Sequence, residues 1–300
     1  MNDERTRFVQ GADAGSLETL WLESDMRKWF ITGVSSGLGS ALAQAAAAGG
    51  DCVAGTVRTE QARAAFSRMY PGLTSGFVLD VTDHDAVAAT IRTADEALGG
   101  IDVLVNNAGY SFEGTLEEAA WADIYGQFAA NVFGPVAVLK ALLPMLRARR
   151  QGLIINVTSM AGYVSVAGIG AYGGAKLALE GISGALAQEV EPFGIHVMTV
   201  IPGAFRTDLG RNRHSAEDLI EDYRAQNMAR RERLAAMTGR QRGDPHKAAL
   251  AIIAASQANP PPRRLVLGID AVAAVAADLQ KFESEIRAWE NLSQGLDLEG

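Results

Sequence analysis

Short apolar runs alternate with longer stretches of helical composition from Lys28 onward. Seven of these runs are short and largely β-branched, as in a parallel sheet covered on both faces: Trp29–Thr32, Cys52–Val57, Gly76–Leu79, Val103–Asn106, Leu153–Thr158, His196–Ile201 and Leu265–Leu267. Segments of helical length lie between them, among them Ser40–Ala48, Asp83–Ala97, Trp121–Leu146 and Ala175–Glu189. The alternation predicts an α/β fold: a single-domain, doubly wound parallel sheet (Rossmann fold) of about seven strands with helices on both faces.

The charged segment after the sixth strand, residues 208–242, lies outside this alternation. A doubly wound sheet binds ligands at the carboxyl ends of its strands, so this segment is expected to be an insertion that forms a substrate lid. Ser215 and Asp218 have the spacing of a helix capping box. An apolar stripe at helical spacing follows them: Leu219, Ile220 and Tyr223. The same pattern also fits a surface helix with a solvated face.

The first residues are polar and acidic, without the basic start and apolar stretch of a signal peptide. We expect residues 1–27 to be a flexible appendage and residues 28–300 to form the Rossmann-type domain. Met26 stands shortly before the first strand and is a second candidate for the start of the protein.

The overall composition narrows the class of protein. Of the 300 residues, 48% are hydrophobic, as in a globular protein with a packed core. The formal charge of −8 disfavours a nucleic-acid partner, because phosphate binding relies on clustered Lys and Arg. No apolar run reaches the length of about 18 residues that a membrane span needs, so none is expected. Cys52 is the only cysteine, which excludes an intrachain disulfide and favours a reducing compartment, the cytoplasm.

A glycine-rich turn joins the first strand to the first helix, with Gly33, Gly37 and Gly39 in the spacing GxxxGxG. Glycines permit a tight turn and a close approach of the backbone to a pyrophosphate. The helix N-terminus adds free N–H groups and a positive dipole end. The turn therefore predicts a dinucleotide phosphate site, although the same glycines would also suit a turn that serves only packing.

The end of the second strand indicates which dinucleotide binds. An NAD enzyme of this architecture places Asp or Glu about 20 residues beyond the turn, where it holds the ribose 2′-hydroxyl. Here Val57 takes that position and Arg58 follows it. A guanidinium binds a 2′-phosphate through charge-assisted hydrogen bonds, so Arg58 favours NADP(H) over NAD(H). Glu60, slightly further along, is the residue that argues for NAD(H).

Polar motifs follow the later strands in a definite order. They are Asn106-Asn107-Ala108-Gly109 after the fourth strand, Asn131 in the next helix, Ser159 after the fifth strand, Tyr172-Gly173-Gly174-Ala175-Lys176, and Pro202-Gly203 with Thr207 after the sixth strand. Together with the glycine turn, this ordered set resembles the short-chain dehydrogenase/reductase family over roughly residues 28–208. Each residue alone also fits an ordinary loop or helix position, whereas the set in this order indicates the family.

Tyr172 and Lys176 are four residues apart and therefore share one face of a helix. A phenol is a poor base at neutral pH, so a neighbouring ammonium and a cationic nicotinamide are expected to lower the Tyr172 pKa. Tyr172 would act as acid and base toward the substrate oxygen, and Ser159 would hydrogen-bond the same oxygen. The resemblance further implies that Lys176 holds the nicotinamide ribose and that Asn131 supports a water chain that resupplies the proton.

The resemblance also implies the cofactor contacts. Besides Tyr172 and Lys176, they are expected from the glycine turn and the strand ends: Gly33, Ser35, Ser36, Gly37, Leu38, Gly39, Arg58, Asp80, Val81, Asn107, Ala108, Gly109, Pro202, Gly203 and Thr207. None of the four histidines falls in a ligand cluster, so no metal site is expected.

Residues beyond the strand ends that should face the nicotinamide are largely apolar and aromatic: Tyr110–Phe112, Met160, Tyr163, Val164 and Phe205. They predict a hydrophobic ketone, aldehyde or secondary alcohol as substrate. Two arginine pairs would bind an acidic group or simply face water: Arg211 with Arg213, and Arg230 with Arg231. In the family, helices such as Trp121–Leu146 and Ala175–Glu189 build oligomers, so a homodimer or homotetramer is expected.

These observations predict an NADP(H)-dependent oxidoreductase that transfers a hydride between nicotinamide and a carbonyl/alcohol pair. A dinucleotide-binding sensor or scaffold without turnover is one alternative, although Tyr172 and Lys176, whose loss would favour it, are both present. A second alternative is an epimerase or dehydratase of the same family, which uses the same tyrosine without net redox change. Such enzymes tend to carry larger C-terminal substrate regions than this chain.

Overall fold

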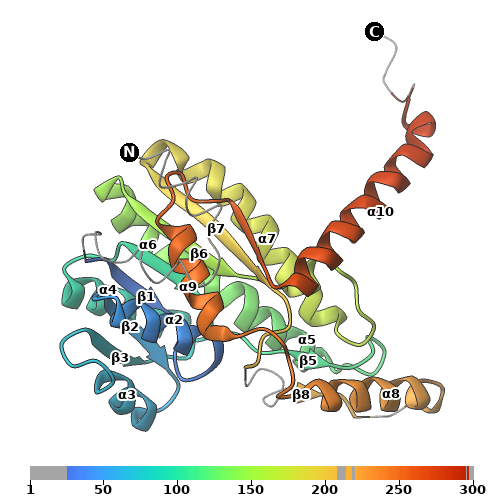
Figure 1. The fold of residues 1–300 in the computed structure, drawn as a ribbon, viewed down its shortest axis with the longest axis horizontal. Coiled ribbons are helices and arrows are strands. Elements are labelled where there is room, and N and C mark those ends of the chain that lie inside the picture. Colours follow the sequence, from blue (N-terminus) through green and yellow to red (C-terminus); the bar gives the residue numbers. More distant parts are fainter. Residues whose placement is uncertain (1–25, 208–213, 218–219, 295, 297–300) are drawn as a thin grey trace.

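The computed structural model describes residues 26–207, 214–217, 220–294 and 296. Seven parallel strands form one sheet in the order β3-β2-β1-β4-β6-β7-β9 (Figure 1). Their bounds are β1 Lys28–Ile31, β2 Cys52–Val57, β3 Thr74–Val78, β4 Val103–Asn106, β6 Gly152–Val157, β7 Ile195–Pro202 and β9 Arg264–Leu267. The predicted doubly wound Rossmann fold is confirmed, because the strand order runs outward in both directions from β1 and β4.

Helices cover both faces of the sheet, as predicted. On one face lie α2 (Gly37–Ala48), α3 (Glu60–Ser67) and α9 (Pro245–Ser256), and on the other α4 (His84–Leu98), α6 (Gly134–Arg149) and α7 (Gly170–Val190). Short 3₁₀ turns flank α7, namely η3 (Met160–Gly162) and η4 (Glu191–Phe193). The sequence prediction did not single out α3, a short helix of eight residues of which only Phe66 is buried.

Neighbouring residues of the central strand enter the two separate halves of the core. In β1, Trp29 and Ile31 pack with α2 and α9, whereas Phe30 packs with α4 and α6. All three side chains are fully buried. Successive side chains of a strand point to opposite faces, so a strand with helices on both sides is apolar at every position. This is why the core strands read as continuous apolar runs.

The helical stretch predicted over Trp121–Leu146 is present as three consecutive segments. They are α5 (Trp121–Phe128), a π-helical turn η2 (Ala129–Phe133) and α6. By length and composition Trp121–Arg149 could cross a membrane, with a mean hydropathy of 1.6 in its most apolar window, but half of that window is buried inside the fold. Val138 and Leu142 of α6 are fully buried in the core, which accounts for the apolar composition.

The charged segment after β7 begins differently from the sequence prediction. His214–Ser215 form a short strand, β8, that pairs in parallel with β5 (Phe112–Glu113). The next helix, α8 (Glu221–Met237), starts six residues beyond Ser215, with Ile220 at its N-cap. The predicted capping box at Ser215 is therefore wrong, because the Ser215 backbone pairs with a strand and does not lead into a helix. Its partner Asp218, and Leu219 of the apolar stripe, lie outside the described residues.

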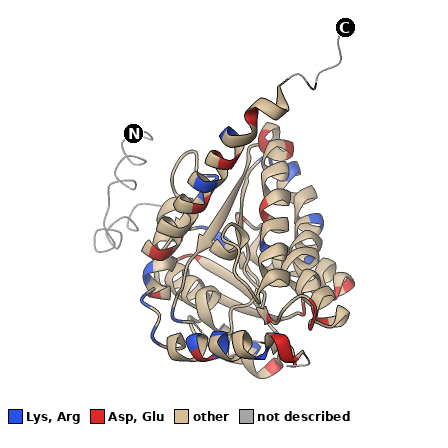
Figure 2. Cartoon of the chain, turned by 90° about the vertical axis from the view of Figure 1, so that its right-hand side faces the viewer, with Lys and Arg blue, Asp and Glu red and all other residues tan. Residues whose placement is uncertain are grey.

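The last helix, α10 (Ile269–Ser293), projects away from the body of the molecule (Figure 1). Ala271 and Val275 are buried at its base. Further along, Phe282 and Trp289 are mostly exposed. Figure 2 shows acidic and basic residues interspersed along the same helix. The base of α10 is therefore part of the domain, whereas its outer turns pack on nothing in the described chain.

Candidate active site

A cavity of about 820 Å³ opens at the carboxyl ends of the parallel strands. All the predicted site residues except Gly39 and Ser159 line it: Gly33, Ser35, Ser36, Gly37, Leu38, Arg58, Asp80, Val81, Asn107, Ala108, Gly109, Asn131, Tyr172, Lys176, Pro202, Gly203 and Thr207. The strand order reverses between β1 and β4, and a doubly wound sheet binds its ligands in the crevice at such a point. The fold thus gathers at one place residues that are far apart in sequence.

At Gly33 and Gly39 the glycine turn is packed so tightly that it leaves no room for a side chain. Gly33 has φ +75°, a left-handed conformation, and a Cβ placed there would lie 3.0 Å from the Ala108 Cα. A Cβ at Gly39 would lie 2.3 Å from the Nδ2 of Asn107. That Nδ2 donates hydrogen bonds to the backbone oxygens of Thr32 (2.9 Å) and Gly33 (3.0 Å). Gly39 is therefore required by the packing of the turn, and Asn107 holds the turn against β4.

The N-terminus of α2 has the properties of a phosphate site. Ser36 is the N-cap, yet its side chain makes no capping hydrogen bond, and the first turn of the helix carries no acidic residue. Ser36, Gly37 and Leu38 all line the cavity. Uncapped N–H groups and the positive end of the helix dipole attract an anion at this position. The turn and the helix end therefore fit the pyrophosphate of a dinucleotide.

The two charged residues after β2 have different surroundings. Arg58 lines the cavity. Glu60 lies in the first turn of α3, where Arg63 donates a hydrogen bond from its Nε at 2.8 Å. Glu60 is absent from the cavity lining and is paired with a cation of its own helix. The residue that argued for NAD(H) is thus turned toward Arg63, whereas Arg58 keeps access to a ligand.

Tyr172, Lys176 and Ser159 form a buried group at the end of β6. The Lys176 Nζ donates a hydrogen bond to the Val157 carbonyl at 2.9 Å and lies 5.8 Å from the centre of the Tyr172 ring. Burial lowers the pKa of Lys176 to about 8. Burial also raises the pKa of Tyr172, and a hydrogen bond with Ser159 opposes that rise. The expected lowering of the Tyr172 pKa is therefore wrong for the protein alone, in which burial is the largest cause of the shift.

Asn131 lies in the π-helical turn η2 and is fully buried. Its Nδ2 donates hydrogen bonds to the backbone oxygens of Tyr110 (3.1 Å) and Gln127 (3.0 Å). Its Oδ1 accepts none from the described residues. A buried acceptor without a protein partner is normally satisfied by water or a ligand, and Asn131 lines the cavity. The π turn therefore leaves one oxygen of Asn131 available inside the site.

The sequence also matches the model of a known protein family. A family model described as short chain dehydrogenase matches residues 27–218, more than half of the chain. The chain belongs to the short-chain dehydrogenase family. The resemblance inferred from the ordered motifs is thereby confirmed.

Similar proteins cover most of this dehydrogenase. The oxidoreductase BOA17 of Botryotinia fuckeliana is 36% identical over 266 residues, which are 88% of this chain and 97% of the relative. A 3-ketodihydrosphingosine reductase of Bacteroides thetaiotaomicron is 40% identical over 195 residues, which are 64% of this chain and 70% of the relative. The crystal structure of a short-chain dehydrogenase from Streptomyces avermitilis aligns with a TM-score of 0.84 at 38% identity, over 92% of this chain and all of that one.

A solved relative also carries a nicotinamide cofactor. A metagenomic short-chain oxidoreductase in complex with NADP is 33% identical and aligns with a TM-score of 0.56, over 60% of this chain and 83% of that one. Together with the glycine turn and the free N-terminus of α2, this supports a nicotinamide cofactor for this dehydrogenase. Among the described residues, no group of three or more His, Cys, Asp and Glu side chains forms a potential metal site.

The dehydrogenase cavity differs from the predicted substrate side at several residues. Tyr110 and Phe205 line it as expected, but Phe112 is buried in β5. The Tyr163 hydroxyl donates to Glu180 at 3.0 Å and so points to another group. The cavity includes His214, which no local motif indicated and whose ring meets that of Tyr110 edge-on at 5.1 Å. His214 reaches the site only because β8 pairs with β5, a contact that no sequence periodicity predicts.

The arginines after β7 also differ from the prediction. Arg230 is buried and forms an ion pair with Glu113, and Arg231 donates to the Ala216 carbonyl at 2.9 Å. These contacts hold α8 to the body of the domain. For Arg230, they contradict the expectation that it faces water or a substrate. Arg211 and Arg213 lie outside the described residues.

Proposed function

We propose that this dehydrogenase is an NADP(H)-dependent oxidoreductase that interconverts an apolar ketone or aldehyde and the corresponding alcohol. The observation that carries the proposal is the buried group of Tyr172, Ser159 and Lys176 beside a cavity that begins at the glycine turn. A proton donor, an oxyanion donor and a phosphate site at one opening are the parts that hydride transfer to a carbonyl requires.

The chemistry divides between the cofactor and the protein. NADPH, when bound, supplies the hydride to the carbonyl carbon. Tyr172 donates its phenolic proton to the carbonyl oxygen, and Ser159 donates a hydrogen bond to the same oxygen as negative charge grows on it. The raised pKa keeps the phenol protonated at neutral pH, which is the form that reduction needs. In the reverse direction, the cationic charges of Lys176 and of the oxidised nicotinamide favour the phenolate.

Lys176 and Asn131 complete the proposed machinery. Lys176 contacts the ribose of the nicotinamide and lies beside Tyr172 through the helix spacing of four residues. Asn131 contributes its free Oδ1 to a water chain that returns a proton to Tyr172 after each turnover. A chain of this kind is needed because Tyr172 is buried and only 8% exposed.

The preference for NADP(H) rests on the second strand. Arg58 binds the 2′-phosphate, while Glu60 is neutralised by Arg63 and does not repel it. Asp80 and Val81 would hold the adenine, and Thr207 with the Pro202–Gly203 turn would hold the carboxamide end. The NADP complex of a relative at 33% identity supports the same assignment.

The apolar substrate is inferred from the cavity and from a relative. Tyr110 and Phe205 line the cavity beyond the proposed cofactor site. A relative that is 40% identical is named for a keto substrate, 3-ketodihydrosphingosine. Residues 208–242 serve as the lid, with the β5–β8 pair as its attachment. A sensor without turnover, or an epimerase or dehydratase without net redox change, is the competing class.

The proposal extends to the assembly and the location of the protein. Exposed aromatic and apolar side chains on α5, η2 and α7 support a homodimer or homotetramer: Trp121, Tyr125, Phe133 and Leu177. We further propose a cytoplasmic enzyme without a membrane or nucleic-acid partner, with residues 1–27 as an appendage to the domain. Of that appendage, residues 1–25 lie outside the described residues.

The test is NADPH oxidation against a panel of ketones and aldehydes, with wild type beside Tyr172→Phe. Turnover on apolar carbonyls should fall about 10²- to 10⁴-fold in the variant, because the general acid is lost. NADPH binding, followed by fluorescence, should stay near the wild-type value. Wild type that binds NADPH but consumes none across the panel would favour the competing class. A fully active Tyr172→Phe variant would refute the role of Tyr172.

A further inference from the structure

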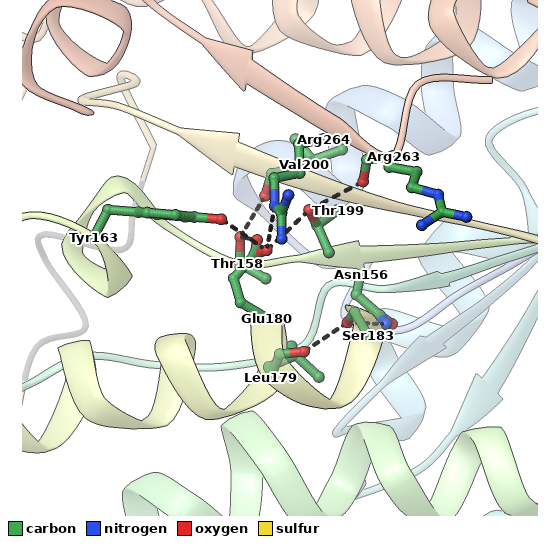
Figure 3. Close-up of polar contacts among 10 residues, drawn as sticks. All are labelled: Asn156, Thr158, Tyr163, Leu179, Glu180, Ser183, Thr199, Val200, Arg263 and Arg264. Atoms are coloured by element: carbon green, nitrogen blue, oxygen red, sulfur yellow. Dashed lines mark hydrogen bonds and ion pairs between the residues drawn. The ribbon is translucent and has the colours of Figure 1, made fainter. Parts of the chain in front are cut away.

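Glu180 is a buried carboxylate on α7 that the proposed reaction does not use. It is only 5% exposed, and it follows Tyr172 and Lys176 at intervals of four residues, so the three share one face of the helix. A carboxylate removed from water requires hydrogen-bond donors in its place. Figure 3 shows that residues from several other elements surround it.

Three hydroxyl groups donate to this carboxylate. Its Oε1 accepts from the Thr158 Oγ1 at 2.7 Å. Its Oε2 accepts from the Tyr163 hydroxyl at 3.0 Å and from the Thr199 Oγ1 at 3.2 Å. The Arg264 Nε, on β9, lies 3.5 Å from the same Oε2 (Figure 3). Glu180 thus joins α7 to β6, β7, β9 and the end of the η3 turn.

Side chains of α7 bind three consecutive residues at the end of β6. Ser183 accepts from Asn156 (2.8 Å), Lys176 donates to the Val157 carbonyl (2.9 Å), and Glu180 accepts from Thr158 (2.7 Å). The next residue is Ser159, which is buried and whose Oγ accepts a hydrogen bond from the Ala161 backbone N–H at 3.1 Å. The alignment of α7 with the end of β6 therefore determines the position of Ser159 relative to Tyr172 of α7.

Glu180 restrains Ser159 from both directions along the chain. Thr158 immediately precedes Ser159, and Tyr163 ends the η3 turn that follows it. Burial, and next the negative charge of Glu180, raise the pKa of Tyr163, so its hydroxyl remains a donor at neutral pH. One carboxylate thus holds the residue before Ser159 and the end of the turn after it.

We propose that Glu180 is a positioning residue that holds residues 158–163 (the Ser159 loop), and with them the Ser159 hydroxyl, in place beside the Tyr172 hydroxyl of α7. This assignment rests on the proposed function, in which those two hydroxyl groups act on the same substrate oxygen. Glu180 itself is absent from the cavity lining and acts only through Thr158 and Tyr163.

The main experiment compares wild type with Glu180→Ala. We expect kcat to fall on the order of 10- to 100-fold, because small displacements of a reacting group cost that much. The Kd for NADPH should stay within about two-fold, since Glu180 does not line the cavity. The apparent pKa of alcohol oxidation should rise, because the Ser159 hydrogen bond lowers the Tyr172 pKa and Lys176 remains in place. A purely structural residue would lower Tm without moving that pKa.

Matched variants separate positioning from general packing. Thr199→Val removes a donor to the same carboxylate from β7 without touching the Ser159 loop, and should keep the wild-type pH profile. Glu180→Gln keeps the shape and one acceptor, and should retain most of kcat. The isosteric double variant Thr158→Val with Tyr163→Phe keeps Glu180 and removes both of its contacts with the Ser159 loop. It should show the loss of kcat expected for Glu180→Ala. It therefore tests the assignment even if the alanine variant does not fold.

The outcomes distinguish this assignment from the proposed function. An active wild type with a Glu180→Ala variant of unchanged kcat and pH profile overturns the assignment alone. The same holds if Thr199→Val loses as much as the Thr158→Val, Tyr163→Phe double variant. A wild type without turnover on any carbonyl overturns the proposed function and the assignment together.

Discussion

Arg230 donates a hydrogen bond from its Nε to the Oε1 of Glu113 at 2.8 Å, across 117 residues of sequence. The Arg230 and Glu113 side chains are 11% and 2% exposed. Arg230 belongs to α8 and Glu113 to β5, which pairs with β8. This buried ion pair attaches the segment after β7 to the domain, close to the point where His214 enters the cavity.

Replacing Arg230 by Met should reduce the free energy of unfolding by about 3 kcal/mol, because it removes one partner of a buried ion pair. The KM for a carbonyl substrate should rise, since β8 and His214 lose part of their support. Urea unfolding and steady-state kinetics measure the two effects. The exposed Arg233 of the same helix is the control, and Arg233→Met should change stability by less than about 0.5 kcal/mol. Equal effects of the two substitutions would contradict this account of Arg230.

The pKa of Lys176 predicts a stability that rises with pH. Burial lowers that pKa from 10.5 to about 8, so between those values the unfolded chain holds a proton that the folded chain has released. Folding stability therefore increases through this window, by up to roughly 3 kcal/mol. Relative to Lys176→Met, wild type should gain stability from pH 8 to 10.5 in denaturant titrations. The loss of the hydrogen bond to Val157 shifts the whole curve of stability against pH by a constant amount, so the slope of that curve is the diagnostic quantity. Parallel curves for wild type and Lys176→Met would refute the lowered pKa of Lys176.

Arg58→Asp should weaken NADPH binding on the order of 100-fold, because it replaces a charge-assisted hydrogen-bond donor with a repelling carboxylate. NADH has no 2′-phosphate, and its affinity should change little. Fluorescence titration with both cofactors measures the ratio. Arg68→Ala, at the exposed C-terminal end of α3 and outside the cavity lining, is the matched control. Equal losses with NADPH and NADH would remove the argument for a 2′-phosphate contact.

Gly39→Ala tests the packing of the glycine turn. The added methyl would lie 2.3 Å from the Asn107 Nδ2 and 2.4 Å from the Gly33 oxygen, so the turn has to move. We expect a loss of about 1 to 3 kcal/mol in the free energy of unfolding, together with weaker cofactor binding. Ser40→Ala, one residue further along α2, should leave both nearly unchanged. A Gly39→Ala variant with wild-type stability would show that the turn tolerates the methyl group.

The main elements of the fold could be predicted because their signals are local. Apolar runs such as Val103–Asn106 identify strands directly, since a strand buried on both faces is apolar at every position. The same approach missed α3, which buries one residue, and misplaced the start of α8, where the Ser215 backbone pairs with β5 instead. Local patterns fail where a distant partner decides the conformation.

The candidate site likewise has some features that the sequence predicts and others that depend on the tertiary structure. Tyr172 and Lys176 are neighbours through the helix repeat alone, and the glycines of the turn are recognisable by their spacing. The entry of His214 into the cavity and the surroundings of Glu180 depend on strands that pair or helices that pack across long separations. The direction of the Tyr172 pKa shift likewise depends on burial, which sequence spacing does not reveal.

The amino-acid sequence by itself determined the order of strands and helices, the family, and the residues that resemble its catalytic and cofactor sites. These follow from short-range periodicity and from motifs in a definite order. Only the tertiary structure decided the pairing of Arg230 with Glu113, the entry of His214 into the cavity, and the bonds from Glu180 to the Ser159 loop. The physical reason is that charge pairing and desolvation depend on which distant segments pack together and exclude water.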